Sequence, residues 1–158
     1  MELVVNEWFL DWHSPNASME EQKHAGLFLK CLLENDHKLV LLRESPFMQK
    51  LHTYRKAFDF YIPARLSLKT FFSNILNNSD KCRIVENALP LPAELEDKLS
   101  QGNFSSDRYL FESAQETEQK IIVTTDQRLI AHIGQTDNFR LITFEDFFQN
   151  HCPKPETS

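Results

Sequence analysis

Glycine is scarce in this chain, and its scarcity excludes two large classes of nucleotide-binding site. Only Gly26, Gly102 and Gly134 occur among 158 residues, and no two of them are close in sequence. The phosphate-binding loop and the dinucleotide-binding fingerprint each need several glycines within a few residues, because the backbone must approach the phosphates closely. The sequence therefore predicts neither kind of site.

Cysteines and long apolar runs are also few. The three cysteines, Cys31, Cys82 and Cys152, are odd in number and widely spaced, which predicts free thiols in a reducing cytoplasm rather than a disulfide framework or a zinc site. Apolar runs are only a few residues long, against roughly 20 for a membrane helix. The acidic N-terminus also lacks the basic start of a signal peptide. We therefore expect a cytoplasmic protein that does not enter a membrane.

Positive charge is in deficit. The chain has 17 Lys and Arg against 23 Asp and Glu, which gives a formal net charge of −6. Nucleic-acid binding would therefore need a local basic patch, because the whole protein does not attract phosphates. A bound divalent cation would account for part of the acidity, since it neutralises the carboxylates that ligate it.

What the chain does contain is a regular alternation of strand and helix patterns. Hydrophobic residues make up 41% of it and include 13 Phe, enough for one full core. The alternation predicts an α/β protein with three α/β/α layers and a five-stranded, mainly parallel sheet in one domain, 1–150, before a disordered tail, 151–158. The predicted strands are 2–5, 38–42, 82–85, 121–124 and 140–142, and the predicted helices are 18–33, 47–58, 64–76, 92–99, 105–117, 127–133 and 144–149.

Polar residues follow the predicted strands at their carboxyl ends, where open α/β sheets place their sites. Asn6 and Glu7 follow the first strand, Glu44 follows the second, and Asp126 follows the fourth. Asp107 opens the helix that leads to the fourth strand. The apolar residues three, four and seven positions after Asp107 share its helix face and must pack on the sheet, so we expect Asp107 to point inward at the same edge.

Several carboxylates in one place predict a divalent-metal site. They repel each other unless a cation neutralises them, and oxygen ligands favour Mg²⁺ or Mn²⁺. A water on such an ion has a lowered pKa and can attack phosphorus, which predicts phosphodiester hydrolysis. Structural roles compete with this interpretation, because Asp107 and Asp126 are also good helix N-caps and Glu44 also fits a solvated loop.

The most basic stretch is 49–56, which contains Lys50, Arg55 and Lys56. These side chains can contact phosphates while Tyr54 stacks on a base, although the same spacing also fits a solvated helix face. Arg128, two residues after Asp126, is a further candidate for contact with phosphate.

Three segments resemble the PIN-domain ribonucleases, whose toxin members pair with antitoxins in bacteria and archaea. Residues 106–114 resemble the family's aspartate that opens an apolar helix, residues 121–126 its strand ending in Thr-x-Asp, and residues 140–148 its last strand and short helix. The resemblance implies a PIN-like fold and RNA cleavage with Mg²⁺ or Mn²⁺. It also implies RNA and an antitoxin-like protein as partners, and a homodimer is compatible with it.

These arguments assign roles to ten residues. Catalysis is assigned to Asp107, Asp126, Glu44 and Glu7, metal ligation to Asp107, Asp126, Glu7 and Asn6, and RNA contact to Lys50, Arg55, Lys56, Arg128 and Thr125.

One departure from the family supports an alternative. Asn6, a neutral and poorer metal ligand, stands where the family has its first aspartate. A PIN-like domain that has lost catalysis and binds RNA or protein is therefore the second hypothesis. A receiver-like signalling domain ranks last, because no predicted strand ends in the lysine that it needs.

Overall fold

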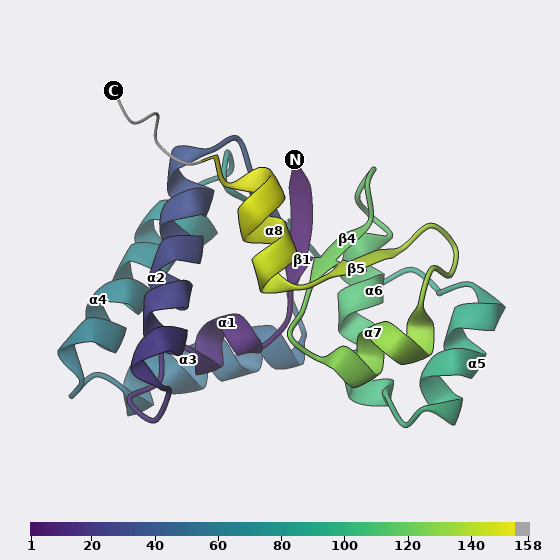
Figure 1. Cartoon of the computed structure of the whole chain (residues 1–158), viewed down its shortest axis with the longest axis horizontal. Helices are drawn as coiled ribbons and strands as arrows, with labels where there is room; N and C mark the ends of the chain where they lie inside the picture. Colours follow the sequence, from purple (N-terminus) through teal and green to yellow (C-terminus); the bar gives the residue numbers. More distant parts are fainter. Residues whose placement is uncertain (154–158) are drawn as a thin grey trace.

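A parallel five-stranded sheet lies at the centre of the computed structural model, which describes residues 1–153 (Figure 1). Its strand order is β3-β2-β1-β4-β5, and every neighbouring pair is parallel. The predicted α/β class and three-layer architecture are confirmed. The strands are β1 (Glu2–Val5), β2 (Lys38–Leu42), β3 (Cys82–Val85), β4 (Ile121–Val123) and β5 (Arg140–Ile142).

Helices cover both faces of this sheet. Figure 1 shows α1, α2 and α4 on one side of β1 and α5, α6 and α7 on the other, and α6 packs directly on β1, β2 and β4. The helices are α1 (Trp8–Asp11), α2 (Met19–Glu34), α3 (Pro46–Ala57), α4 (Ile62–Thr70), α5 (Ala93–Gln101), α6 (Arg108–Ala114), α7 (Gln127–Ile133) and α8 (Phe144–His151), with a π-helix at Phe71–Leu76 and a 3₁₀ turn at Ser105–Asp107.

The strand order creates a reversal point between β1 and β4. The chain adds β2 and β3 on one side of β1 and then returns to add β4 and β5 on the other. The carboxyl ends of β1 and β4 therefore mark the crevice position at which such sheets place their ligand sites.

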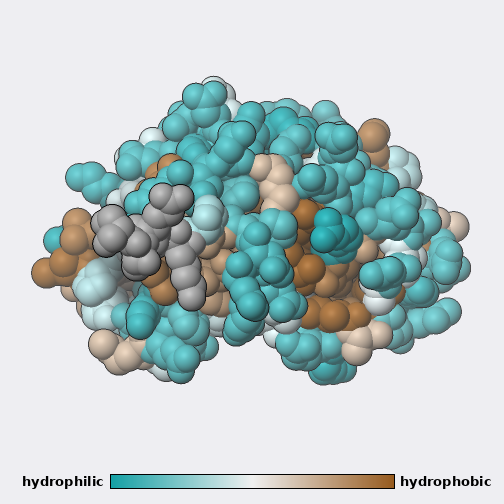
Figure 2. Space-filling view, turned by 45° about the horizontal axis from the view of Figure 1, so that its top comes forward, coloured by the Kyte–Doolittle hydropathy of each residue, from teal (hydrophilic) through white to brown (hydrophobic). Residues whose placement is uncertain are grey.

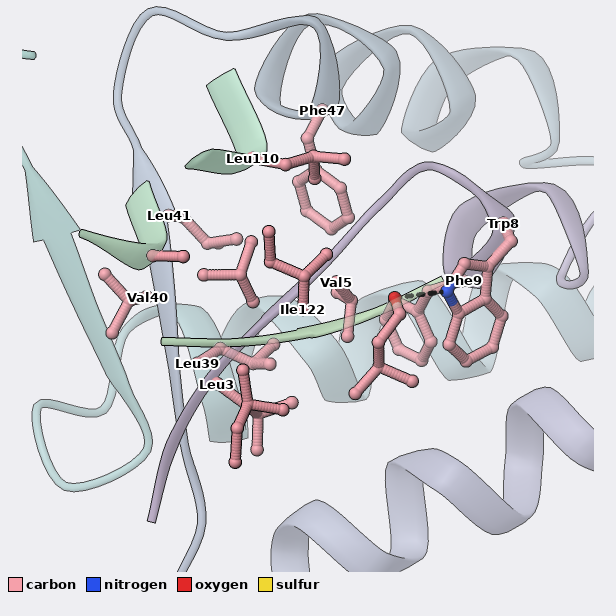
Figure 3. Packing of buried hydrophobic residues seen from close by; sticks show 14 of the residues in the cluster. Leu3, Val5, Trp8, Phe9, Leu39, Val40, Leu41, Phe47, Leu110 and Ile122 are labelled. Atoms are coloured by element: carbon pink, nitrogen blue, oxygen red, sulfur yellow. Dashed lines mark hydrogen bonds between the residues drawn. The ribbon is translucent and has the colours of Figure 1, made fainter. Parts of the chain in front are cut away.

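Aromatic side chains from three helices form much of the core. Trp8 of α1, Phe28 of α2 and Phe144 of α8 meet with ring centroids 5.2 to 6.1 Å apart. The Trp8 indole N–H also donates to the carbonyl of Val123 at 2.9 Å, which fixes α1 to the end of β4 (Figure 3). The packing of the core therefore positions α1 at the crevice.

Several boundaries differ from the sequence prediction. The short helix α1 was not predicted, and the predicted helix 64–76 is an α-helix that continues as the π-helix. The predicted helix 105–117 is a 3₁₀ turn followed by α6, and β4 ends one residue early at Val123. Ser18 caps α2 as expected, with a full capping box to Glu21.

The prediction of three free thiols is wrong. Cys31 of α2 and Cys152 form a disulfide, and only Cys82, which is buried, is a free cysteine in the described part of the chain. The predicted tail begins too early, because His151 ends α8 and Cys152 is bonded to Cys31. Residues 154–158 of that predicted tail lie outside the described residues.

The face shown in Figure 2 is mainly hydrophilic and carries separate apolar areas. Phe60, Ile62 and Leu66, at and just before α4, are among the exposed large hydrophobic residues. Within residues 1–153, no helix combines the length and the apolar character that crossing a membrane requires.

Candidate functional site

Polar side chains converge at the crevice between β1 and β4. The Asn6 amide, just after β1, donates to the Thr124 hydroxyl, just after β4, at 2.9 Å, so the two strand ends are tied together. The Asn6 Oδ1 atom is buried and has no hydrogen-bond partner among the described residues. A buried oxygen without a donor is costly, so Asn6 Oδ1 is an acceptor that a ligand could use.

Asp107 lies at the junction of the 3₁₀ turn and α6, directly before the helix. Its side chain makes no capping hydrogen bond to α6, so the structural alternative of a cap does not apply. Burial raises the pKa of Asp107 to about 6, and the negative charges of Asp126 and Glu7 add to this effect. Asp107 is therefore partly buried and within electrostatic reach of Asp126 and Glu7, and its inward direction stays a prediction.

Asp126 caps α7, as the structural alternative predicted. Its Oδ1 atom accepts from the backbone N–H groups of Arg128 at 3.0 Å and Leu129 at 3.1 Å, and the Thr124 hydroxyl accepts from the backbone N–H of Asp126 at 3.1 Å. Both capping bonds use the same oxygen, so Oδ2 remains for a ligand. Capping and ligand binding are thus compatible at this residue.

Glu7 and Asp11 extend the acidic cluster along α1 and hold a lysine from α3. Lys50 Nζ lies 3.1 Å from Glu7 Oε2 and 2.8 Å from Asp11 Oδ1, and the Tyr54 hydroxyl donates to Asp11 Oδ1 at 2.7 Å. Burial acts to lower the pKa of Lys50, but its hydrogen bonds to Asp11 and Glu7 outweigh burial and raise it. Lys50 is therefore a permanent cation inside the cluster.

Tyr109 of α6 completes the cluster and was missed by the sequence argument. Its hydroxyl is buried and has no hydrogen-bond partner within residues 1–153. Burial raises the pKa of Tyr109, and the charges of Glu7, Asp107 and Asp11 raise it further. The hydroxyl therefore stays protonated beside three carboxylates, although no spacing rule links it to Asp107. We name Asn6, Glu7, Asp11, Lys50, Asp107, Tyr109 and Asp126 the acidic crevice.

The other predicted site residues lie at the surface. Glu44 is exposed and forms no ion pair with the described residues, so the structure supports the solvated-loop alternative for it. Arg128 is exposed, with its guanidinium 6.0 Å from the ring centroid of Phe104. Thr125 is exposed and lines the same pocket as Asp11, beside the acidic crevice.

The side chains of Arg55 and Lys56 lie on the outer surface of α3, apart from Lys50. Arg55 stacks 4.4 Å from the ring centroid of Phe72 and lines a pocket of about 440 Å³ together with Arg65 and Lys69. Lys56 is exposed beside His52. Of the basic stretch 49–56, Lys50 thus lies in the acidic crevice, and Arg55 and Lys56 lie on the outer surface of α3 and α4.

The described residues do not form a complete metal-binding site on their own. Among residues 1–153, no group of three or more His, Cys, Asp and Glu side chains is arranged to hold a metal ion. Any cation site here would therefore rest on the Asp107 and Asp126 carboxylates, with the amide oxygen of Asn6 and water completing the ligands.

Comparison with known proteins gives no further guidance. No family model, no curated protein and no solved structure matches this chain.

Proposed function

We propose that this chain is a metal-dependent ribonuclease of the PIN-like type that hydrolyses RNA phosphodiester bonds at the acidic crevice. The observation that carries the proposal is the partly buried Asp107, whose pKa is raised by burial and by the charges of Asp126 and Glu7, together with the buried Asn6 Oδ1, which has no partner among the described residues. Structural acids are normally satisfied by nearby donors, whereas Asp107 is half-buried among like charges. Such perturbed acids gather at functional sites.

The oxygen atoms at the acidic crevice are of the kind that Mg²⁺ and Mn²⁺ prefer as ligands. Mg²⁺ is commonly held by one or two carboxylates and keeps several waters, so a full protein cage is not required. Asp107, the free oxygen of Asp126 and Asn6 Oδ1 supply hard oxygen ligands, and a cation would relieve the repulsion that raises the pKa of Asp107. When bound, the ion supplies Lewis-acid stabilisation and a water of lowered pKa.

The chain itself supplies positioning and two further donors. Lys50 is held between Glu7 and Asp11 and keeps its positive charge. The protonated Tyr109 hydroxyl has no acceptor in the described structure. Both groups can donate hydrogen bonds to a phosphate oxygen, where negative charge builds up during hydrolysis.

Cleavage of a labelled single-stranded RNA in Mn²⁺ or Mg²⁺ tests the proposal. We expect Asp126→Asn to lose at least a hundredfold in rate while it stays folded, because Asn is also a good N-cap. Asp97→Asn, at an exposed position of α5, is the matched control and should cleave like the wild type. Equal rates for the wild type and Asp126→Asn, or no cleavage with either metal, would contradict the proposal.

A binding module that has lost catalysis is the second candidate, and two observations favour it. Asn6 replaces an acid, and the Lys50 ammonium already neutralises Glu7 and Asp11. Melting curves with increasing Mn²⁺ distinguish the two, because an ion that binds only the folded protein raises its melting temperature. A protein that retains RNA on a filter but shows no Mn²⁺-dependent rise is the binding module.

The antitoxin-like partner, the homodimer and the cytoplasmic location stay predictions of this proposal. A reducing cytoplasm would keep Cys31 and Cys152 as thiols, since disulfides are rare there. The redox state of this pair in cells therefore tests the predicted location.

A further inference from the structure

We propose that an aromatic pocket beside the acidic crevice binds a base of the substrate strand; this inference rests on the proposed function. The pocket, which we name the base pocket, has a volume of about 470 Å³ and lies between α1, the loop that follows it, and α3. Its lining includes Trp8, Trp12, Tyr54, Asp11, Asn16 and Thr125. This volume falls in the range of small-molecule sites.

The base pocket adjoins the proposed cleavage site. Asp11 is shared between the two, because it binds Lys50 in the acidic crevice and lines the base pocket. Thr125, which precedes the capping residue Asp126, forms another part of the lining. A strand whose phosphate lies in the crevice would therefore have a neighbouring nucleoside at the base pocket.

Contacts within the protein already hold the aromatic side chains of the base pocket in place. Trp8 is anchored by its hydrogen bond to the Val123 carbonyl (Figure 3). Trp12 packs edge-on against Trp8, with the ring centroids 4.7 Å apart, and Tyr54 is oriented by its bond to Asp11. Because Trp12 and Tyr54 are partly exposed and already held, a base could stack on them at little cost in conformational entropy, and the buried Trp8 supports Trp12.

The charges of the base pocket favour a base over a phosphate. No lysine or arginine of the described chain lines it, and its charged residues are Asp11 and Glu21. Asp11 is already bonded to Lys50 and Tyr54, and Glu21 to the backbone of Ser18, so the described lining offers no free cation to a phosphate, while the exposed Asn16 amide can bond a base. The basic pocket at Arg55, Arg65 and Lys69 has the opposite character, so the two pockets are suited to different parts of a nucleotide.

The test compares three RNA pentamers in EDTA, which prevents metal-dependent cleavage. These are oligo-adenosine, oligo-uridine and an abasic pentamer with the same phosphates. Since the protein has only two tryptophans, quenching of their fluorescence reports stacking directly. We expect the base-bearing pentamers to quench and the abasic one not to, with an affinity gap of about 5- to 150-fold for one stacked base.

Two variants and a control complete the experiment. Trp12→Ala should weaken binding of the base-bearing pentamers to the level of the abasic one. Asn16→Ala should change the preference between adenosine and uridine without loss of fold, because Asn16 is exposed and its recorded bond to Ser14 uses only its backbone N–H. Gln101→Ala, exposed on α5, should bind like the wild type.

The outcomes separate this inference from the proposed function. Base-dependent quenching in a protein that does not cleave RNA would support the base pocket and refute the nuclease. Cleavage without a difference between base-bearing and abasic pentamers, wild-type affinity in Trp12→Ala, or no binding of any pentamer would overturn the base pocket.

Discussion

Among single residues, Asp107 and Asp126 illustrate two different uses of a carboxylate at the start of a helix. Asp126 accepts two hydrogen bonds from the backbone of α7 with its Oδ1 atom, and its Oδ2 atom remains for a ligand. Asp107 makes no cap, and burial together with the charges of Asp126 and Glu7 raises its pKa to about 6. The surroundings of Asp107 therefore disfavour its charged form. A bound cation would stabilise that charged form and lower the pKa.

The raised pKa of Asp107 predicts a pH-dependent cost to stability. The folded protein binds this proton more tightly than the unfolded chain, so the stability associated with it is present at low pH and is lost as the pH rises from 3.8 to 6. Solvent screens this partly exposed group, so the difference is below about 3 kcal/mol. Asp107→Asn should therefore be more stable than the wild type at pH 7 but not at pH 4. Urea unfolding across this range measures the difference, and parallel profiles for the two proteins would refute it.

We expect the ion pairs of Lys50 with Glu7 and Asp11 to contribute to the stability of the fold. The Lys50 ammonium separates Glu7 and Asp11, so Lys50→Met should leave two partly buried carboxylates without a cation and cost about 1 to 2 kcal/mol. Lys56→Met, at an exposed position on the same helix, is the control and should change stability by less than about 0.5 kcal/mol. Chemical denaturation of both proteins measures the gap, and equal stabilities would show that the ion pairs contribute nothing.

Among the secondary-structure elements, α7 allows the capping role of Asp126 to be tested separately from its proposed role in RNA cleavage. Asp126→Ala should lose about 1 kcal/mol because two backbone N–H groups lose their acceptor. Asp126→Asn should stay within a few tenths of a kcal/mol of the wild type, because Asn caps equally well. Thermal melting of the two variants, read beside their RNA cleavage, tests this separation. A large loss of stability in Asp126→Asn would mean that the charge itself, not the cap, supports α7.

The elements also show which parts of the fold could be predicted from sequence. The strands at 2–5, 38–42, 82–85 and 140–142 were predicted to the residue, because their short length and partly β-branched content favour a strand over a helix. The helix α1 was missed, because four residues are too few to show a periodicity.

The candidate site was only partly predictable for a related reason. Asp107 and Asp126 follow from strand ends and a helix face, which are local patterns. The bonds of Lys50 to Glu7 and Asp11 join residues 43 and 39 positions apart, and the Tyr109 hydroxyl meets its neighbours only through the packing of α6. Such contacts are set by tertiary structure, and no local pattern in the sequence encodes them.

At the scale of the whole molecule, the disulfide joins distant parts of the chain. Cys31 and Cys152 are 121 residues apart, and their bond ties the end of α8 to α2. Closing so long a loop restricts the unfolded chain, so reduction should lower the free energy of unfolding by about 2 to 4 kcal/mol. Unfolding with and without a reductant measures this loss. The double variant Cys31→Ser with Cys152→Ser should not respond to reductant, and a wild type that is equally unresponsive would contradict the bond's contribution.

The strand order is the other feature of the whole molecule on which function depends. Only a reversal between β1 and β4 brings Asn6, from the start of the chain, against Thr124, from near its end. The same crevice then receives Asp107 from the 3₁₀ turn, Tyr109 from α6 and Lys50 from α3. The proposed ribonuclease site is therefore a product of the topology rather than of one segment.

A crystal of the protein soaked in Mn²⁺ shows whether the acidic crevice binds a metal ion. Anomalous scattering locates the ion without reference to activity. We expect a peak within ligand distance, about 2.0 to 2.3 Å, of carboxylate oxygens of Asp107 and Asp126, and its absence from Asp107→Asn crystals. A well-ordered soaked crystal with no peak at the acidic crevice, or with peaks only at other surface acids, would contradict this expectation.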